Sequence, residues 1–438
     1  MQRTTRTFSL EQVSNFKDKM LAWAQQFDTV VWLDSNAYKQ EYSSFDAVLA
    51  IEEFTSIKTD SYHAFDKLKE YQSISQDFVF GYIGYDVKND IEELTSSNFD
   101  GLKFSDLFFF QPQKILFLRG NHIEFDYLGM VEDDIDFDFE QIKNQTTQQT
   151  TNENSLRIQH RIQKSEYLQK VSNILHHIHR GDIYEANFCQ EFYAENAKIQ
   201  PYQIYQNLNK ISETPFASFL KVDAHYLLSA SPERYLKKEG SRIISQPIKG
   251  TAKRMPNPTE DQQIATDLFQ DPKERSENIM IVDLVRNDLS RTAKKGSVQV
   301  EELCKVYSFK QVHQMISTVV SEVDLETHPV EVIKHTFPMG SMTGAPKISA
   351  MKIIEEQETT KRGLYSGAVG YFSPDGDFDF NVVIRSILYN EEKKYISFSV
   401  GSAITAKSTP KKEYEECLIK AKAMQLVLTK SDLQPNTL

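Results

Sequence analysis

Short runs of aromatic and β-branched residues recur along the chain, and they constrain its fold most because such runs favour β-strands. Before residue 144 they read VVWLDS, FVFGYIGYD and KILFLRG. After residue 180 they include HYLLSAS, GAVGYFS, DFNVVIRSILY and KYISFSVGSAI. Apolar residues at helical spacing stand between them, at about 10–27 and 165–179. This alternation predicts a mixed α+β fold with much antiparallel pairing.

A polar stretch at 144–154, NQTTQQTTNEN, has too few apolar side chains to pack against a core. We therefore predict an N-terminal region (1–143), a polar linker (144–156) and a second region (157–430). We expect the two regions to form one intertwined sandwich.

Composition excludes several classes of partner. The net charge of -12 argues against nucleic acid, which is bound mainly by clustered lysine and arginine. No run approaches the roughly 20 apolar residues of a membrane helix, so we expect no membrane contact and a cytoplasmic location. Cys189, Cys304 and Cys417 form no CxxC pair, which predicts buried thiols in a reducing compartment.

The segment QPIKGTAKR places Lys249 between Pro247 and Gly250. This pattern predicts a tight turn that presents one amine at a fixed place. A solvated surface lysine is the alternative, and Glu233 in SPERYL has the same alternative as a surface acid.

Two pairs of acids stand three residues apart, which puts each pair on one face of a helix. They are Glu274 with Glu277 in KERSENIMIVDLVRND, and Glu413 with Glu416 in STPKKEYEECLIKAKAM. Four carboxylates that converge can hold Mg²⁺, which takes oxygen ligands and shares its site with anionic substrates. An acidic helix face is the alternative.

The glycine-rich segment GSMTGAPK runs into a helix expected to begin near Ala345. It is not a Walker loop, because Ala345 and Pro346 separate Gly344 from Lys347. An anion site at the helix N-terminus and plain turn structure both remain open.

Taken together, six ordered motifs resemble the chorismate-utilising enzymes, a family that includes anthranilate, aminodeoxychorismate, isochorismate and salicylate synthases. The motifs are PIKGT, ExxENxMIVDLxRND, GSMTGAPK, RGLYSGAVGY, DFNVVIRS and EYEECLIKAKA, within about 160–428. WLDS and GYIGYD resemble the N-terminal part shared by the anthranilate and aminodeoxychorismate branches. The resemblance implies a layered α/β/β/α sandwich with two packed, mostly antiparallel sheets and an active site between them.

The resemblance also implies roles for single residues. Glu277 and Glu416 match magnesium ligands, with Glu274 and Glu413 beside them, and the metal is expected to hold the ring carboxylate of chorismate. Glu233 matches the general acid that protonates the departing 4-hydroxyl. Other matched positions are catalytic or contact the substrate: Glu274, His313, Gly250, Thr251, Tyr365, Arg385, Gly401, Ser402, Ala403, Lys420 and Glu185. Of these, Tyr365 and Arg385 match the residues that hold the enolpyruvyl carboxylate.

Lys249 indicates the branch within the resembled family. This chain reads PIKGT, which is similar to the aminodeoxychorismate branch, whereas the anthranilate branch has PIAGT at this place. Amination at C4 with retention is two displacements: an enzyme amine attacks C2, then ammonia attacks C4. A lysine desolvated in a closed pocket is expected to lose its charge more easily and become nucleophilic. Glu233 would give a proton in the first step and take one in the second.

Two departures from the family pattern stand out. Glu185 in IYEANFCQ differs from the family pattern. At the matching position the amine-transferring branches usually have glutamine, and the isochorismate and salicylate branches have lysine. Ser402 and Ala403 in VGSAIT replace glycines. We also find no region of the size of a glutaminase, so we expect a separate glutamine amidotransferase partner. The expected product is 4-amino-4-deoxychorismate, on the route to 4-aminobenzoate and folate, and the alternative is the anthranilate reaction.

Overall fold

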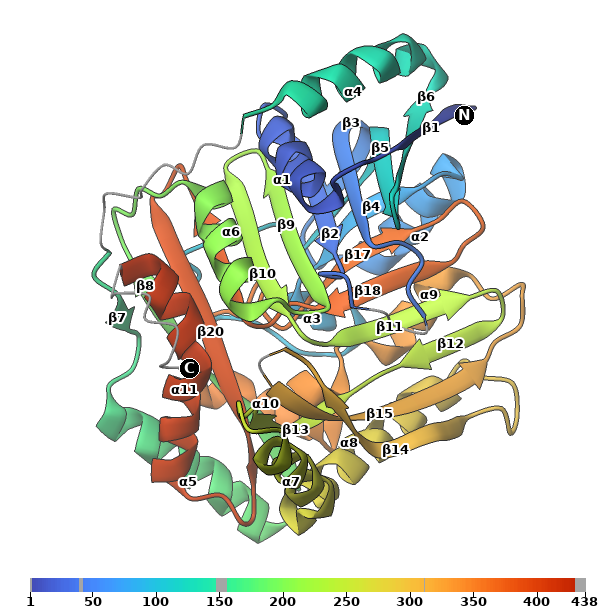
Figure 1. Ribbon diagram of the computed structural model, residues 1–438. Helices are drawn as coiled ribbons and strands as arrows, with labels where there is room; N and C mark the ends of the chain where they lie inside the picture. Colours follow the sequence, from blue (N-terminus) through green and yellow to red (C-terminus); the bar gives the residue numbers. More distant parts are fainter. Residues whose placement is uncertain (1, 39–41, 147–155, 311, 430–438) are drawn as a thin grey trace.

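The strands join into one antiparallel network that branches at β5 (Leu107–Arg119), as Figure 1 shows. The computed structural model describes residues 2–38, 42–146, 156–310 and 312–429. The first half of β5 pairs with β4 (Val79–Ile83) and its second half with β6 (His122–Leu128), while β3 (Ala47–Thr59) runs along its other edge. β5 therefore belongs to two sheets that diverge from it.

Each branch continues as a series of antiparallel neighbours. The first runs from β3 through β2 (Thr29–Asp34), β9 (Phe216–Val222), β10 (His225–Ser231), β19 (Ser386–Asn390), β20 (Tyr395–Thr405) and β8 (Glu185–Ala194). The second runs from β4 through β17 (Ala368–Phe372), β18 (Phe378–Val382), β11 (Arg234–Glu239), β12 (Arg242–Ser245) and β15 (Val312–Glu322), which also pairs with β13 (Ile248–Lys253) and β14 (Gln299–Ser308). Short strands at the edges are β1 (Arg3–Ser9) on β6, and β7 (Gln159–His160) and β16 (Gly344–Ala345) on β8.

All of these ladders are antiparallel, so the predicted α+β class is confirmed. The two sequence regions share the network, because β2 pairs with β9 and β4 pairs with β17. Of the predicted linker, residues 147–155 lie outside the described residues.

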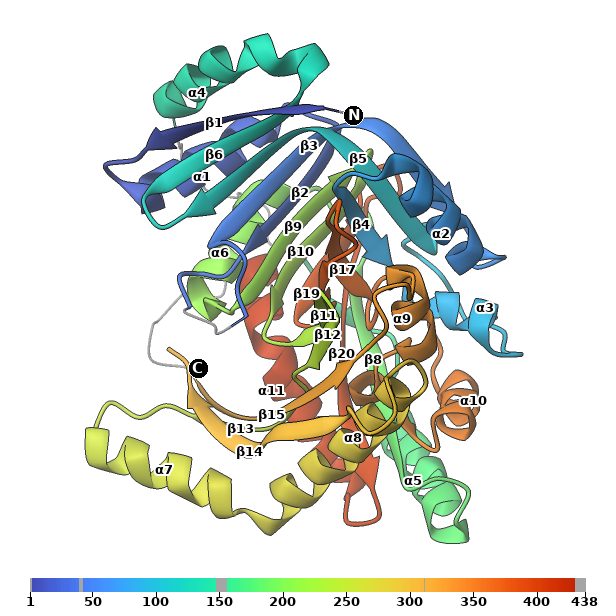
Figure 2. The same ribbon diagram turned by 90° about the vertical axis from the view of Figure 1, so that its right-hand side faces the viewer.

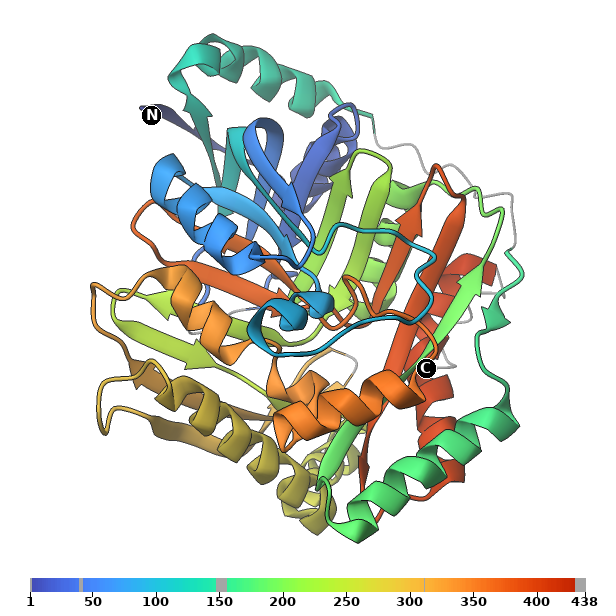
Figure 3. The ribbon, with the colours of Figure 1, turned by 180° about the vertical axis from the view of Figure 1, so that it is seen from behind.

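Alternation along the strands puts one core between the two branches and two more beneath the helices. Phe80, Phe108, Leu220 and Tyr371 belong to the inner core. Helices over the first branch are α1 (Val13–Ala24), α4 (Ile135–Asn144), α5 (Lys164–Arg180), α6 (Pro201–Ser212), α10 (Lys347–Gln357) and α11 (Pro410–Thr429). Those over the second are α2 (Ala64–Ser75), α8 (Pro272–Ser290) and α9 (Pro329–Thr336), with α7 (Pro258–Gln270) beside β13 and β14 and the short α3 (Lys88–Ile91) before β5. Figures 2 and 3 show this layering from two further sides.

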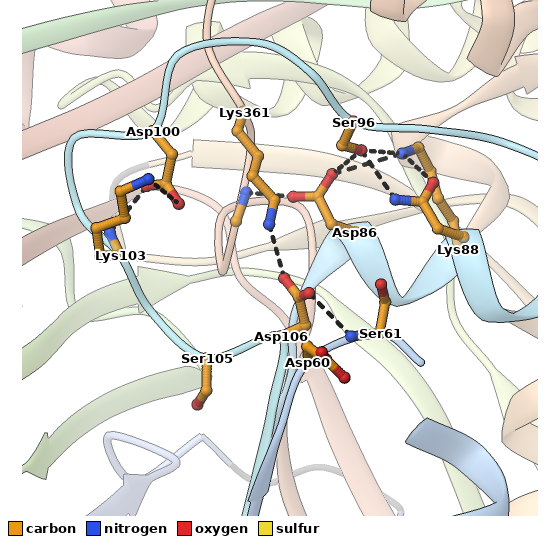
Figure 4. Close-up of polar contacts among 12 residues, drawn as sticks. Asp60, Ser61, Asp86, Lys88, Ser96, Asp100, Lys103, Ser105, Asp106 and Lys361 are labelled. Carbon is orange, nitrogen blue, oxygen red and sulfur yellow. Dashed lines mark hydrogen bonds and ion pairs between the residues drawn. The ribbon is translucent and has the colours of Figure 1, made fainter. Parts of the chain in front are cut away.

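The N-terminal region clamps the segment that leads into β17. Lys361 donates to Asp106 at 2.9 Å, and Asp86 accepts from the backbone N–H of Gly363 at 2.9 Å. Asp86 is itself ion-paired with Lys88 at 3.4 Å, and both residues are buried (Figure 4). Contacts between residues more than 200 apart in sequence thus hold together the two halves of the sandwich.

Three smaller expectations have mixed outcomes. The cysteines are free and buried, as predicted. Within the described part of the chain, no helix is long and apolar enough to cross a bilayer. The prediction of one strand over DFNVVIRSILY is wrong. β18 ends at Val382 and β19 begins at Ser386, because Arg385 has a φ of +52° that a regular strand does not contain.

Candidate active site

The first two turns of α8 and α11 carry the four predicted metal ligands. α8 begins at Pro272 because Asp271 caps it, accepting from the backbone N–H groups of Lys273 at 2.8 Å and Glu274 at 3.0 Å. Glu274 and Glu277 follow in its first turns, and Glu413 lies in the first turn of α11 with Glu416 one turn later. Glu274 and Glu413, which lie in the first turns, are close to the positive ends of the helix dipoles.

Lys273 supplies a positive charge to this acidic group. Its Nζ lies 3.8 Å from Glu274 Oε1 and 3.6 Å from Glu277 Oε1. Burial alone lowers the pKa of Lys273, but Glu277, Glu274, Glu416 and Glu413 together raise it above its usual value. The four carboxylates are therefore close enough to act on one cation.

Burial raises the pKa of Glu277 to about 7, although Lys249 and Lys273 oppose the rise. Its Oε1 is buried and has no hydrogen-bond partner. Within the described ranges, no three His, Cys, Asp or Glu side chains already form a group that could hold a metal ion. The donor set is all oxygen and suits Mg²⁺, and Glu277 Oε1 is a buried acceptor that no hydrogen bond uses.

The predicted tight turn at Lys249 is wrong. Residues 248–253 form β13, and the register against β15 shifts between Ile248 and Thr251 because the chain bulges by one residue at Lys249 and Gly250. Gly250 has a φ of +90°, and a Cβ there would lie 3.1 Å from Glu274 Oε2. The bulge thus brings Lys249 toward α8.

Lys249 is surrounded by acids. Its Nζ donates to Glu185 Oε1 at 3.1 Å, and the side chains are 13% and 1% exposed. Burial lowers the pKa of Lys249, but Glu185, Glu277 and Glu233 outweigh it, so the pKa is raised overall. The expectation that desolvation discharges this lysine is therefore wrong for the ligand-free protein, because nearby carboxylates stabilise the ammonium.

Glu233 lies between β10 and β11 and is buried. Burial raises its pKa to about 7, while a hydrogen bond from Ser341 and the charge of Lys249 partly offset the rise. A carboxyl group with this pKa is about half protonated at neutral pH, so it can give a proton and also accept one.

Glu185 begins β8 and is held on both sides. Its backbone faces Ala345 of β16 and Thr405 of β20. A Cβ on Gly344 would lie 2.1 Å from the Glu185 carbonyl oxygen, so only glycine fits there. The nearby Lys347 ion-pairs with buried Asp288 at 2.6 Å. The GSMTGAPK segment therefore has a structural role in fixing Glu185, which favours the turn explanation over an anion site.

Arg385 and Tyr365 are the predicted carboxylate-binding pair. Among the residues that the structure describes, the Arg385 guanidinium has no side-chain hydrogen bond or ion pair, and burial lowers its pKa. Tyr365 is buried, with its hydroxyl 3.6 Å from Cys189 Sγ. The charge of Glu416 also acts on Arg385. Arg385 is thus a cation without an ion-pair partner in the described part of the chain, and it lies within the electrostatic reach of one of the four acids.

Gly401 lies directly against β8, where a Cβ would stand 2.5 Å from Cys189 Sγ. Its carbonyl oxygen accepts from Lys420 Nζ at 2.9 Å, and Lys420 also pairs with Glu416 at 2.7 Å. Lys420 therefore links the Gly401 strand to a predicted metal ligand. Ala403 is next on the same face of β20, since side chains alternate.

Three predicted residues are placed less directly. Ser402 is buried on the opposite face of β20, toward Tyr167, so a substrate contact would have to come from its backbone. Thr251 is exposed on β13. His313 is buried, and its ring nitrogens contact Ser308 at 2.8 Å and Asp261 at 3.0 Å.

Sequence reasoning missed Lys273 and Asp261. Lys273 directly precedes Glu274, so a cation within the acidic motif was visible. Asp261 carried no such signal, because it reaches His313 across 52 residues.

The sequence from 28 to 426 matches the family model described as chorismate binding enzyme. The chain belongs to the chorismate-binding enzymes. It is 35% identical over 357 residues to an anthranilate synthase component I-like protein of Synechocystis sp., covering 80% of this chain and 72% of that protein. It is 38% identical over 253 residues to aminodeoxychorismate synthase component 1 of Escherichia coli, covering 58% of this chain and only 55% of that protein.

Among solved structures, anthranilate synthase component I of Streptococcus pneumoniae is similar, with a TM-score of 0.78 and 26% identity, covering 89% of this chain and 95% of that one. This chorismate-binding enzyme thus has relatives that carry both names, and its fold matches the anthranilate synthase structure.

Proposed function

We propose that this chorismate-binding enzyme is component I of an aminodeoxychorismate synthase, which aminates chorismate at C4. The observation that carries the proposal is the amine of Lys249 on the bulge of β13, 13% exposed and surrounded by Glu185, Glu233 and Glu277. An enzyme that uses only ammonia as nucleophile needs no amine there. A covalent amine needs a fixed, shielded position, and Lys249 has one.

The remaining residues divide the work. Glu233 donates a proton to the departing 4-hydroxyl and later accepts one from ammonia, and its pKa of about 7 suits both directions. Arg385, with Tyr365 beside it, binds the enolpyruvyl carboxylate, because its guanidinium is free for a bidentate contact. The backbone of the Gly401 segment, held by Lys420 beside Glu416, would help to bind the same carboxylate.

Glu277 and Glu416 would hold Mg²⁺, with Glu274 and Glu413 as direct or water-mediated support. When bound, the ion would offset the charge of the ring carboxylate, worth several kcal/mol at order of magnitude. Lys273, which now balances the four acids, would have to give way to it.

A separate glutamine amidotransferase would supply the ammonia, in line with the E. coli relative, whose name describes it as one component. The purified chain should then use ammonium but not glutamine, and addition of an amidotransferase component should confer glutamine use. Glutamine use by the chain alone would refute this part.

The alternative function is anthranilate synthase component I, favoured by the Synechocystis relative and the Streptococcus structure. To decide, the chain is incubated with chorismate, MgCl₂ and excess ammonium, and products are separated by chromatography. We expect a product that yields 4-aminobenzoate only after a lyase is added. Anthranilate formed directly would overturn the proposal.

A second readout follows the covalent step. Acid quenching during turnover should trap a mass increase on the peptide that contains Lys249, and Lys249→Ala should lose it. The exposed Lys143, changed to alanine, is the matched control and should leave both adduct and rate unchanged.

A further inference from the structure

We propose that Glu185 is the proton acceptor for Lys249, taking the proton that the ammonium loses before the amine attacks chorismate. The inference rests on the proposed function, in which Lys249 is the nucleophile. It assigns a role to the residue that departs most clearly from the family pattern.

Lys249 and Glu185 are in direct contact. Lys249 Nζ and Glu185 Oε1 are 3.1 Å apart, a hydrogen-bond distance along which a proton can move. Within the described part of the chain, Glu185 is the acid in hydrogen-bond contact with this ammonium. The other carboxyl oxygen of Glu185, Oε2, is buried without a hydrogen-bond partner. The carboxyl group therefore has an unused acceptor and is not committed to a structural network.

Glu185 is held in a fixed position by its neighbours. Glu185 is 1% exposed, and β16 and β20 flank its backbone. Gly344 lies so close to its carbonyl group that a Cβ there would stand 2.1 Å from the Glu185 oxygen. A base held in this way needs little rearrangement to reach the amine.

The charge around Lys249 is negative. Carboxylates face it from several elements: Glu185 from β8, Glu233 between β10 and β11, Glu274 and Glu277 from α8, and Glu416 from α11. Glu185 contributes most to the raised pKa of the lysine, so the residue that holds the ammonium is the one placed to take its proton. A nucleophile in this setting needs an acceptor beside it, since its side chain is largely shielded from water.

The step balances as follows. One proton moves from Nζ to Glu185, breaking an N–H bond and forming an O–H bond. The lone pair left on Nζ forms the N–C2 bond, the two ring double bonds each move by one position, and the C4–O bond breaks. Glu233 gives its proton to the leaving hydroxyl, which departs as water. The products are a secondary ammonium adduct on Lys249, neutral Glu185 and ionised Glu233.

The experiment compares wild type, Glu185→Gln and Glu185→Asp in ammonia-dependent turnover from pH 6 to 10. Glutamine keeps the size and the hydrogen bond but cannot accept the proton. We expect about a 10²-fold or larger loss of kcat at pH 7 in Glu185→Gln, with recovery as solvent base removes the proton at high pH. Glu185→Asp should stay within about tenfold of wild type.

Competitive acetylation of Lys249, followed by mass spectrometry, gives a readout without catalysis. Loss of the Glu185 charge should lower the pH at which Lys249 becomes reactive, and an unchanged profile would refute the contact. A Glu185→Gln rate within twofold of wild type at pH 7 would overturn proton transfer. So would an equal loss in both variants at every pH, which indicates a structural role.

Failure of this inference can be told apart from failure of the proposed function. If wild type releases anthranilate, the function itself is wrong. If wild type yields the 4-aminated product and Glu185→Gln keeps its rate, only the role of Glu185 is wrong.

Discussion

The ion pair between Lys249 and Glu185 makes an asymmetric prediction about stability. At 3.1 Å and an effective dielectric constant of about 20, two unit charges attract by about 5 kcal/mol before desolvation is subtracted. Removing one partner of a buried pair costs about 3–5 kcal/mol, because the other charge is left buried. We expect about 3 kcal/mol for Lys249→Met, since the side chain retains some contact with water.

Glu185→Gln should cost less, about 1–2 kcal/mol, because Lys249 keeps Glu277 and Glu233 as counter-charges. The double variant should cost at least about 2 kcal/mol less than the sum of the single variants.

Urea unfolding measures these differences, monitored by fluorescence of buried Trp23 and Trp32 and by circular dichroism, which must give coincident transitions. The exposed pair Lys143 and Glu140 is the control, and the same substitutions there should cost less than about 0.5 kcal/mol. Additivity of the Lys249 and Glu185 variants within about 0.5 kcal/mol would refute the pair.

Three further outcomes are expected. Because Glu233 must be protonated to donate and its pKa is about 7, kcat/KM should fall above pH 7. Glu233→Gln should lower kcat about 10²–10⁴-fold and remove this fall of kcat/KM at high pH. If the fall persists in the variant, it belongs to another group. Gly401→Ala would place a Cβ 2.5 Å from Cys189 Sγ, so it should lower the free energy of unfolding in urea by about 1–3 kcal/mol. Cys189→Ala should partly restore that stability, and an unchanged stability in Gly401→Ala would contradict the close packing. Lys273→Gln should raise the Mg²⁺ affinity measured by calorimetry about tenfold, or about 1.4 kcal/mol, because Lys273 contacts Glu274 and Glu277. Equal affinity in the variant and the wild type would show that this lysine does not compete with the ion.

Much of the fold was predictable because strand and helix patterns are local. The helices expected at 165–179 and 10–27 are α5 and α1 within a few residues. The errors came where tertiary contacts override the local pattern. A run of β-branched residues continues through Arg385, yet the backbone breaks there, and β15 draws Lys249 into a bulged strand instead of a turn.

The site was predictable where residues lie close in sequence and uncertain where they do not. The spacing of Glu274 and Glu277 fixed their common face, since a helix has a set periodicity. No local pattern shows that Glu185 meets Lys249 across 64 residues, or that three carboxylates raise the pKa of a lysine that desolvation was expected to discharge.

The position of this pair also explains why the fold does not separate the two candidate reactions. Lys249 lies on β13 in the second branch of the network, and Glu185 lies on β8 in the first, so the pair spans the space between branches joined at β5. Uncharged residues at both positions would leave every strand pairing unchanged, because neither side chain supports a ladder. A similar fold is therefore compatible with either reaction, and in the proposed mechanism the difference depends on whether an amine faces the substrate with a base beside it.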